Sequence, residues 1–500
     1  MADWHFYGRT ESLLELNRIV NAERWFFCRI EGRRRIGKTS LLSQLAKRET
    51  SLAPRLIYMQ VPDSDERDVA TAFRRSLSDS GDVVAQTLGE KVVDFPTMAR
   101  GIGELCQHGF IVVLDEFQYF TRSALYSFNS FLQAEVDRLR HDNVKQGGLF
   151  VLGSLHADMN QLLEDRGAPL YGRLTHRIKV DHWDFEDLVE VFRSQQVLEP
   201  SQWLTLWTFF EGVPKFYHDA FEQDLYDVGA DQFTDELLIR MFIRSSSPLS
   251  EEADTWFLRE LRGRSLSILS YLAEHQGCGS GELLAGVGSP EEKTQISAYL
   301  TKLVTKYEMV AKRNPVFSDG KSRNARYYIA DNFLQAWLAV AKPAREAARL
   351  KPIEATLNMA KTRLARVEGF AFEKLIQKLH LECSRKGKGD FELSSLQLGY
   401  WNRPKDSSRS VEIDLVALDE PNKRIRFGSC KRSANAHTSE SLTGFKNHID
   451  TFLEAKEHRH IRGWTQEMML FSPKFTDADR NRLRQKGFMA RDLNDYAALF

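Results

Sequence analysis

The apolar positions in the first third of the chain fall into short, nearly continuous runs that alternate with helix-like stretches. Four of these runs, at residues 25–30, 55–60, 109–114 and 148–153, predict buried strands. Runs that are apolar on both faces are typical of parallel sheets covered by helices on either side. The pattern therefore predicts a parallel α/β sheet at the start of the chain.

The pattern changes after this region. Residues 184–259 repeat Trp, Phe and Leu at helical spacing and contain no convincing strand, which predicts a helical lid or bundle. Next come helix-like segments that include 265–274 and 293–306, followed by turn residues and an apolar strand at 326–330. Three helices and then a hairpin is the order of a winged helix.

The last part of the chain predicts a small α/β domain. Residues 342–366 are rich in Ala, Lys and Arg and predict a basic helical connector. A helix at 370–379 is followed by two strand-like runs on either side of a turn at 421–423. The predicted divisions are a core at 1–183, a helical lid at 184–260, a winged helix at 261–340, a connector at 341–366 and a C-terminal domain at 367–500.

Composition narrows the class of protein. The 500 residues are 42% hydrophobic and 28% charged, which is typical of a folded protein of roughly three domains. No apolar run approaches the ~20 residues that span a bilayer, and no signal-peptide pattern opens the chain, so we expect a cytoplasmic protein without a membrane partner. The five cysteines lack CxxC spacing and predict neither disulfides nor a zinc site.

The charge is balanced overall but unevenly distributed. Lys plus Arg equals Asp plus Glu at 69 each, yet residues 181–260 carry a net charge of −13 and residues 342–410 a net charge of +7. Only the later segment is suited to a polyanion.

A phosphate-binding loop is predicted at IEGRRRIGKTS. Gly32 and Gly37 are separated by four residues, directly after an apolar strand and directly before a helix-like segment. Glycines let backbone N–H groups surround phosphates, Lys38 reaches the terminal phosphates, and the Thr39 hydroxyl binds Mg²⁺. The candidate nucleotide-binding residues of the loop are Gly32, Arg33, Arg34, Arg35, Ile36, Gly37, Lys38, Thr39 and Ser40.

A second element supports an ATP site. The buried run GFIVVLDEF places Asp115 and Glu116 at the carboxyl end of a strand, where ligands gather in open α/β sheets. Asp115 is the candidate Mg²⁺ ligand through water, and Glu116 is the candidate group that polarises the attacking water. The cofactors predicted are ATP and Mg²⁺.

Taken in order, FYGRTESLLEL, GRRRIGKTSLL, VVLDEFQYF, LFVLGSLHADM and PLYGRL resemble the AAA-related, STAND-like archaeal ATPase family over roughly the first 240 residues. The resemblance implies that Gly8 and Arg9 lie near the base pocket, that Ser154 is a sensor residue, and that Arg173 senses charge at the γ-phosphate. An ordinary salt bridge is the alternative for Arg173. The lid motif EGVPKFY departs from the family pattern at Glu211, where a second glycine is common.

The region from about Val367 to the end resembles the DUF234 domain, which is similar to PD-(D/E)xK nucleases. That resemblance assigns Asp414 to a Mg²⁺-binding carboxylate and Lys431 to the lysine that activates water. Ser429 stands where a second carboxylate is expected, so nuclease activity is open. Glu412, two residues before Asp414 and hence on the same strand face, and Glu373 on the preceding helix are the candidates to complete the site.

The sequence thus predicts an ATPase whose nucleotide state controls a winged-helix and nuclease-like half that contacts double-stranded DNA. Basic residues of the winged helix and the final domain supply phosphate partners. Two alternatives stay open: a slowly hydrolysing STAND-type signalling switch, which assembles as a homo-oligomer when nucleotide binds, and a DNA-binding regulator without nuclease activity. The basic residues in question are Lys293, Lys302, Lys306, Lys312, Arg313, Lys321, Arg323, Arg326, Arg385, Lys386, Lys388, Arg403, Lys405 and Arg409.

Overall fold

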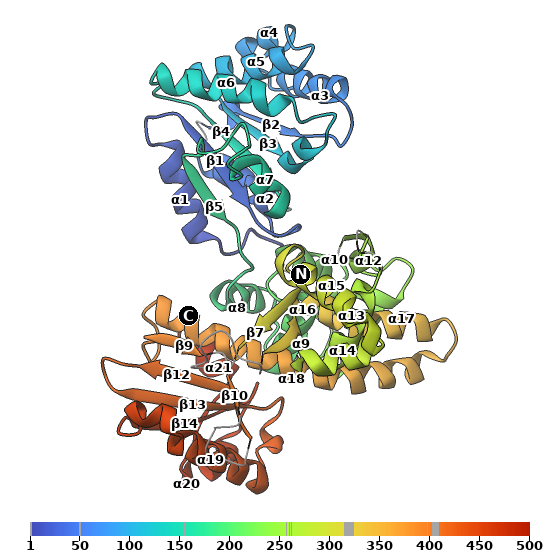
Figure 1. The fold of residues 1–500 in the computed structure, drawn as a ribbon, viewed down its shortest axis with the longest axis vertical. Helices are drawn as coiled ribbons and strands as arrows, with labels where there is room; N and C mark the ends of the chain where they lie inside the picture. The colour runs from blue at the N-terminus through green and yellow to red at the C-terminus, as the bar shows by residue number, and fades with distance from the viewer. Residues whose placement is uncertain are drawn as a thin grey trace. The chain divides into compact units, whose positions relative to one another are not determined.

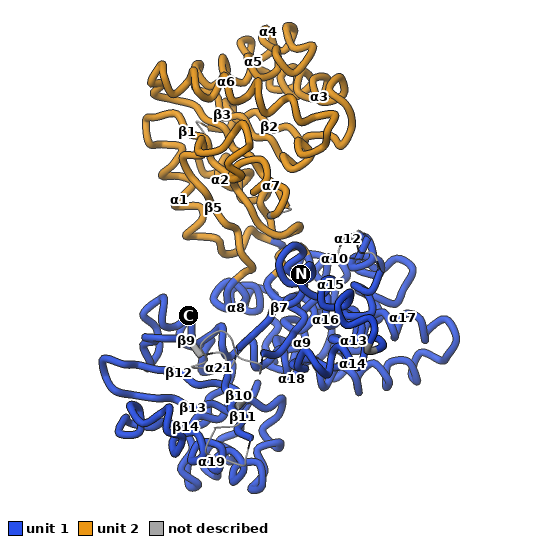
Figure 2. Tube along the Cα trace, viewed as in Figure 1, with its two compact units in different colours: residues 1–4, 184–212, 216–500 blue, residues 5–183, 213–215 orange. Residues whose placement is uncertain are grey.

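The computed structural model describes residues 3–49, 52–154, 156–256, 258–259, 261, 263–314, 325–397, 399–402 and 410–500. The chain divides into two compact units, drawn in different colours in Figure 2. The N-terminal unit comprises His5–Trp183 and Val213–Lys215, and the C-terminal unit comprises the remainder. Lys321, Arg323, Arg403, Lys405 and Arg409 lie outside the described residues.

A five-stranded parallel sheet forms the centre of the N-terminal unit, in the order β2-β3-β4-β1-β5. The four predicted strands are confirmed, with shifts of one or two residues at their ends, and β5 is an edge strand that the apolar pattern did not reveal. The strands are β1 (Phe26–Glu31), β2 (Leu56–Gln60), β3 (Ile111–Asp115), β4 (Gly148–Gly153) and β5 (His176–Lys179).

Helices cover both faces of this sheet (Figure 1). Alternate residues such as Phe27, Val112 and Leu149 pack with α3 to α7, whereas Phe26 and Val113 pack on the opposite face with α1 and α2. Because both faces are buried, the strands must be apolar throughout, as the sequence pattern indicated. The helices are α1 (Thr10–Val20), α2 (Lys38–Arg48), α3 (Glu66–Ser78), α4 (Val83–Gly89), α5 (Phe95–Gln107), α6 (Phe128–His141) and α7 (His156–Leu163), with short η1 (Ala53–Arg55) and η2 (Phe117–Thr121).

The C-terminal unit begins with the predicted run of helices. Apolar side chains at helical spacing, such as Phe185, Leu188 and Phe192 in the first helix, are buried. The elements are α8 (Phe185–Ser194), α9 (Pro200–Phe210), α10 (Pro214–Glu222), η3 (Leu225–Asp227), α11 (Phe233–Leu238), η4 (Ile239–Ile243) and α12 (Glu252–Trp256).

The next segment combines three helices with a small antiparallel sheet in the order β6-β8-β7. β7 and β8 form a hairpin whose connection, 315–324, lies outside the described residues. The three helices followed by the β7–β8 hairpin occur in the order expected from the sequence, whereas β6, between the first two helices, was not predicted. The elements are α13 (Ser265–Glu274), β6 (Cys278–Gly279), α14 (Ser280–Val287), η5 (Pro290–Glu292), α15 (Lys293–Thr305), β7 (Val310–Arg313) and β8 (Arg326–Ile329).

One 33-residue helix, α18 (Ile353–Arg385), runs through the predicted boundary between connector and C-terminal domain. It follows α16 (Asn332–Ala336), η6 (Trp337–Ala341) and α17 (Lys342–Ala348). Pro343 lies in the first turn of α17 and Pro352 is the N-cap of α18, positions that need no intrahelical N–H bond. The division at 366/367 therefore does not correspond to a break in the chain. None of the described helices is both long and apolar enough to cross a membrane.

The final domain contains a five-stranded sheet in the order β15-β14-β13-β12-β9 and a two-stranded sheet of β10 and β11. The run 411–419, expected as one strand, is interrupted at Asp414, and its halves join different sheets. The elements are β9 (Ser395–Gln397), β10 (Tyr400–Asn402), β11 (Val411–Ile413), β12 (Leu415–Asp419), β13 (Arg424–Cys430), η7 (Ala434–Ala436), α19 (Ser439–Glu454), η8 (Lys456–Ile461), β14 (Thr465–Phe471), α20 (Asp477–Gln485), β15 (Met489–Arg491) and α21 (Leu493–Ala497).

A buried histidine makes this domain sensitive to acid. His380 on α18 packs against the rings of Phe471 and Tyr496, and within the described chain its Nε2 has no hydrogen-bond partner. Burial, assisted by the charge of Arg426, lowers the pKa of His380 to about 3. The folded state therefore keeps His380 neutral, whereas the unfolded chain takes up a proton below a pH of about 6.5, so stability is lost as the pH falls through that value.

We expect His380→Phe to reduce this loss. Between about pH 7.5 and about pH 5.5 the natural chain should lose about 1.4 kcal/mol of unfolding free energy through this residue, and the variant should not. Urea unfolding at each pH measures the unfolding free energy. It is monitored by pulsed hydrogen exchange of the amides in β13 and β14, with the labelling step always at the same pH. The exposed His141→Phe is the matched control, and an equal loss in all three proteins would contradict the expectation.

Candidate nucleotide site and a second carboxylate site

The loop between β1 and α2 has the backbone of a phosphate-binding loop. Gly32, Arg35 and Gly37 all have positive φ angles, of 157°, 65° and 89°. A Cβ at Gly32 would collide with the backbone oxygen of Val180, so only glycine fits there. A Cβ at Gly37 would meet no atom within 4 Å, which places Gly37 beside open space at the start of α2. The loop thus ends at a helix N-terminus, the position that binds phosphate.

Lys38 is enclosed by the loop. Its Nζ donates to the carbonyl oxygens of Gly32 at 2.9 Å and Arg33 at 3.2 Å. Burial lowers the pKa of Lys38, while the charges of Asp115 and Glu116 raise it. A buried ammonium that bonds only neutral carbonyls gains strongly from an anion, because charge-assisted hydrogen bonds to phosphate are stronger.

Asp115 lies at the end of β3 and faces Thr39. Its Oδ2 accepts hydrogen bonds from the Thr39 hydroxyl at 2.9 Å and from the Tyr58 hydroxyl at 2.8 Å. Burial raises the pKa of Tyr58, and the bond to Asp115 raises it further. A carboxylate and a hydroxyl at this separation are the oxygen ligands that Mg²⁺ takes beside nucleotide phosphates. Sequence analysis did not find Tyr58, because nothing in its local pattern marks it.

Glu116 follows Asp115 in a left-handed backbone conformation, with φ of 56°. Its N–H donates to Asp115 Oδ1 at 2.8 Å, and its Oε2 accepts a short hydrogen bond from Gln118 Nε2. Non-glycine residues in this region cost of order 1–3 kcal/mol and cluster at functional sites. Gln118 therefore holds the candidate base, and it is a further residue that sequence analysis missed.

The other predicted nucleotide residues are placed as follows. Arg9 donates to the carbonyls of Ile36, at 3.0 Å, and Asp181, so Gly8 and Arg9 lie against the phosphate-binding loop. Ser154 follows β4, between the ends of β1 and β3, at the same sheet edge. Ser40 is exposed on the first turn of α2.

Arg173 is not brought to this site. Its guanidinium makes two hydrogen bonds to the carboxylate of Asp137 on α6, at 2.8 and 2.7 Å. It precedes β5, and the neighbouring Thr175 bonds the carbonyl of Phe27 at the start of β1. That is the opposite end of a strand roughly 20 Å long. Of the two interpretations of Arg173, charge sensing or an ordinary salt bridge, its geometry in this chain agrees with the salt bridge.

A fully buried arginine lies beneath the loop. Arg29 on β1 contacts Glu31 and donates to Asn160 on α7 at 2.7 Å and to Glu164, the residue after α7, at 2.8 Å. It therefore connects the strand that leads into the phosphate-binding loop with the helix that follows Ser154. The sequence signal for this role was a charged residue, Arg29, within the apolar run FFCRIE.

In the C-terminal unit, Glu211 has a structural role that explains its departure from glycine. Its carboxylate is nearly fully buried, pairs with Lys374 of α18 at 2.8 Å and accepts from the N–H of Asn332 at 3.0 Å. Lys374 also donates to the carbonyl of Ala330 at 2.7 Å. Although Glu211 adopts a positive φ of 53°, these bonds hold the end of α9 against α16 and α18.

The residues of the predicted nuclease-like site are neighbours. Burial raises the pKa of Glu373 well above its usual value, Asp414 and Glu412 raise it further, and Lys431 opposes them. Burial also raises the pKa of Asp414, although the N–H of Cys430 donates to its Oδ2 at 2.7 Å. A bound cation would favour the charged forms of these carboxyl groups against burial, so three carboxyl groups beside one lysine favour a cation.

Glu412 and Asp414 do not share a strand face as expected. The interruption at Asp414 leaves Glu412 on β11 with a side chain 61% exposed, and Glu412 Oε1 accepts a hydrogen bond from Arg326 at 2.7 Å. Across the described residues, these carboxylates do not form a set of three ligand atoms within 4.8 Å. Ser429 is buried on β13.

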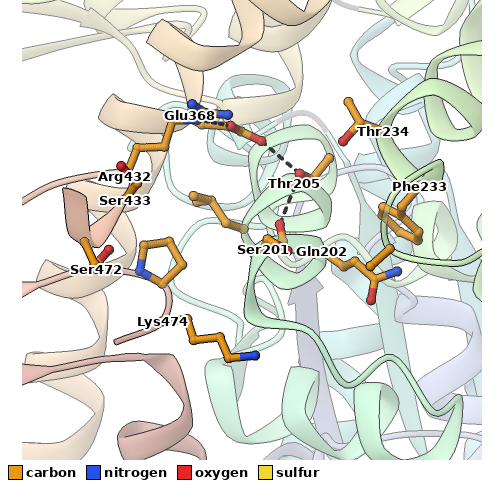
Figure 3. A pocket seen from close by; sticks show the side chains of 14 residues that line it. Ser201, Gln202, Thr205, Phe233, Thr234, Glu368, Arg432, Ser433, Ser472 and Lys474 are labelled. Carbon is orange, nitrogen blue, oxygen red and sulfur yellow. Dashed lines mark hydrogen bonds and ion pairs between the residues drawn. The ribbon is translucent and has the colours of Figure 1, made fainter. Parts of the chain in front are cut away.

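A cavity of about 360 Å³ lies beside this domain, between α9, α11, α18 and the carboxyl ends of β13 and β14. In Figure 3, Glu368 lies between Arg432 and Thr205. Glu368 Oε2 accepts from Arg432 Nε at 2.6 Å, and its Oε1 accepts from the Thr205 hydroxyl at 2.8 Å. Because Arg432 directly follows Lys431, these bonds connect α9 to the end of β13.

Two family models match the chain. Residues 6–218 match an ATPase domain described as predominantly from Archaea. Residues 337–442 match DUF234, described as archaeal and bacterial proteins of unknown function. The second match begins before α18 and ends within α19, whereas the sequence resemblance was placed from about residue 367 to the end.

The chain is also similar to individual proteins. An uncharacterized protein of Methanocaldococcus jannaschii is 26% identical over 435 residues, which covers 85% of this chain and 87% of that protein. Among solved structures, a Walker-type ATPase of Pyrococcus abyssi is 17% identical, with a TM-score of 0.48, and covers 67% of this chain and 96% of its own. The Aeropyrum pernix ORC2 protein in ADPNP–ADP complexes is 15% identical, with a TM-score of 0.46, over 73% of this chain and 98% of its own.

We expect the buried pair Glu211–Lys374 to be required for the packing of the lid against α18. Glu211→Gln leaves the Lys374 ammonium without its carboxylate and should cost about 3 kcal/mol, because breaking a buried pair from one side is strongly destabilising. Glu211→Gln with Lys374→Gln should recover part of that loss. Urea unfolding, monitored by hydrogen exchange of the amides in α9 and α16, measures the unfolding free energy of both variants. The exposed Asp231→Asn is the control. If the loss in the double variant equals the sum of the losses in Glu211→Gln and Lys374→Gln alone, the two residues are not coupled.

Proposed function

Because residues 6–218 carry the archaeal ATPase domain and residues 337–442 a DUF234 domain, we propose that the chain binds and hydrolyses Mg²⁺–ATP and that its nucleotide state controls a DNA-contacting C-terminal unit. The observation that carries the ATPase part is the arrangement of Lys38, Thr39 and Asp115 around one loop. An ammonium, a hydroxyl and a carboxylate lie at the carboxyl edge of the sheet, with a helix N-terminus beside them.

The residues fit a nucleotide and its metal ion. The loop N–H groups and Lys38 would bind the phosphates, and Thr39 and Asp115 would hold Mg²⁺, which would supply positive charge beside the transferred phosphoryl group. Tyr58 orients Asp115 through the hydrogen bond at 2.8 Å. Glu116 takes a proton from the attacking water once Gln118 releases its carboxylate.

The C-terminal unit supports contact with duplex DNA. The segment α13–β8 has the element order of a winged helix, a fold that places its third helix in the major groove. Lys293 and Lys312 are exposed on α15 and β7. Phosphate contacts from such residues give affinity that does not depend on sequence. Glu373, Asp414 and Lys431 are the candidate metal site of a nuclease-like domain, with Glu373 in place of the carboxylate that Ser429 lacks.

The bonds of Glu368 offer a route from the lid to this site. A lid helix that moves Thr205 would move Glu368 and, through Arg432, the strand end that carries Lys431. Nucleotide-dependent movement of the lid thereby changes the position of the candidate catalytic lysine. Coupling of this kind requires two packed arrangements, which a hydrogen-bonded junction beside a cavity allows.

A second function, a slowly hydrolysing switch, is favoured by the hydrogen bond between Gln118 and Glu116. A base that is occupied by a neighbouring amide turns over slowly while nucleotide stays bound. This function predicts nucleotide-dependent assembly, measured by light scattering, with negligible turnover.

We expect two substitutions to separate binding from hydrolysis. Lys38→Ala should weaken ATP binding at least about tenfold, because it removes a charge-assisted contact to the phosphates. Glu116→Gln should keep binding and lower single-turnover hydrolysis by roughly 10²- to 10⁴-fold, the usual contribution of a general base. Lys47→Ala, on the exposed face of the same helix as Lys38, is the matched control.

The same assay with duplex DNA tests the second half of the proposal. Hydrolysis that rises with DNA and is lost in both variants supports an ATPase coupled to DNA. If Glu116→Gln hydrolyses ATP as fast as the natural chain, Glu116 is not the general base. If nucleotide binds without turnover and DNA has no effect, the slowly hydrolysing switch becomes the better description.

A further inference from the structure

The β7–β8 hairpin of the C-terminal unit lies against the carboxylate cluster. Arg326 on β8 donates to Glu412 Oε1 at 2.7 Å, and its guanidinium lies over the ring of Trp401 on β10, 5.1 Å from the centroid. β10 pairs with β11, the strand that carries Glu412. The hairpin therefore contacts the strands that carry the cluster through both a charge pair and a cation–π contact.

A second arginine of the hairpin lies directly opposite Arg326, because Arg313 on β7 is the register partner of Arg326 on β8. Arg313 packs over the ring of Tyr328 at 4.8 Å. Burial lowers the pKa of Arg313, and the charges of Tyr328 and Glu373 raise it. The charge of Arg313 in turn lowers the pKa of Glu373, against burial and the two neighbouring carboxylates.

The hairpin places positive charge where a cation would be held. Arg326 pairs with Glu412, and Arg313 lies opposite Arg326 on the neighbouring strand, so two guanidinium groups accompany the cluster. One divalent cation would supply the same positive charge. Two arginines and a metal ion together would overcompensate a partly buried site, which is unfavourable.

The position of Glu412 also indicates that the hairpin and a metal ion exclude each other. Its carboxylate is bonded to Arg326, and in the part of the chain that the structure describes it does not converge with Glu373 and Asp414 into a set of three metal ligands. Withdrawal of the hairpin would free Glu412 to turn toward the other two carboxylates.

We infer that the β7–β8 hairpin and a divalent cation compete for the carboxylate cluster, so that the metal binds only when Arg313 and Arg326 leave. This inference rests on the proposed metal-binding role of Glu373 and Asp414. Phosphates of duplex DNA are the ligand that draws the hairpin away, because guanidinium groups pair strongly with phosphate. DNA and metal then strengthen each other's binding by the same factor.

Binding of Mn²⁺ to the full chain, followed by electron paramagnetic resonance without nucleotide, tests the competition. We expect Arg313→Gln with Arg326→Gln to bind Mn²⁺ at least about tenfold more tightly than the natural chain, since a competing charge pair is removed. Arg326→Gln alone, at a partly exposed position, should give part of the gain if the double variant folds poorly. Arg349→Gln with Lys351→Gln removes two exposed positive charges from another part of the C-terminal unit and should change nothing.

A second arm adds duplex DNA of mixed sequence. Mn²⁺ affinity should rise in the natural chain and should not rise further in the double variant. Asp414→Asn in each background identifies the bound metal as that of the cluster. Mn²⁺ binding that depends on Asp414 but is equal in the natural chain and the double variant overturns the competition and leaves the metal site intact. If no protein binds Mn²⁺ in an Asp414-dependent manner, the metal site and the competition both fail.

Discussion

The C-terminal unit depends on one helix, α18, whose buried and partly buried polar side chains bind the helices at the start of that unit and the strands of its final domain. Glu368 bonds α9 and the end of β13, Lys374 bonds Glu211, and Gln377 donates to the carbonyl of Asp414 at 3.1 Å. Glu382 accepts the N–H groups of Phe185 and Glu186 at the start of α8. Each of these groups is costly to bury unpaired, so the partner elements must stay in place for α18 to be stable.

The sequence predicted strands where burial on both faces leaves no alternative to apolar residues. β1 to β4 were found for that reason, whereas β5 lies at the sheet edge and buries only Ile178 within HRIK, too little for a pattern. The length of α18 was missed because it is covered on several sides. Residues such as Thr356, Gln377 and Glu382 are buried on it, so no single apolar stripe marks where it begins or ends.

The candidate nucleotide site could be predicted because its main residues are contiguous in the sequence. The loop, Lys38 and Thr39 act through backbone geometry that local spacing specifies. Tyr58, Gln118 and Arg29 contribute through side-chain contacts that depend on how strands and helices pack, and single residues carry no pattern. The role of Arg173 followed from resemblance alone, and sheet register places it at the wrong end of the strand within one chain.

The proposed metal site would take one carboxylate from α18, because Ser429 stands where a strand carboxylate was expected. Glu373 and Lys374 are successive residues, about 100° apart around the helix, so one faces the cluster while the other pairs with Glu211 at the end of α9. A strand carboxylate would be fixed by its sheet, whereas a helix carboxylate moves with the helix. Any shift of α18 that breaks the pair with Glu211 must therefore reposition Glu373, so the proposed metal site would depend on how α9 packs against α18.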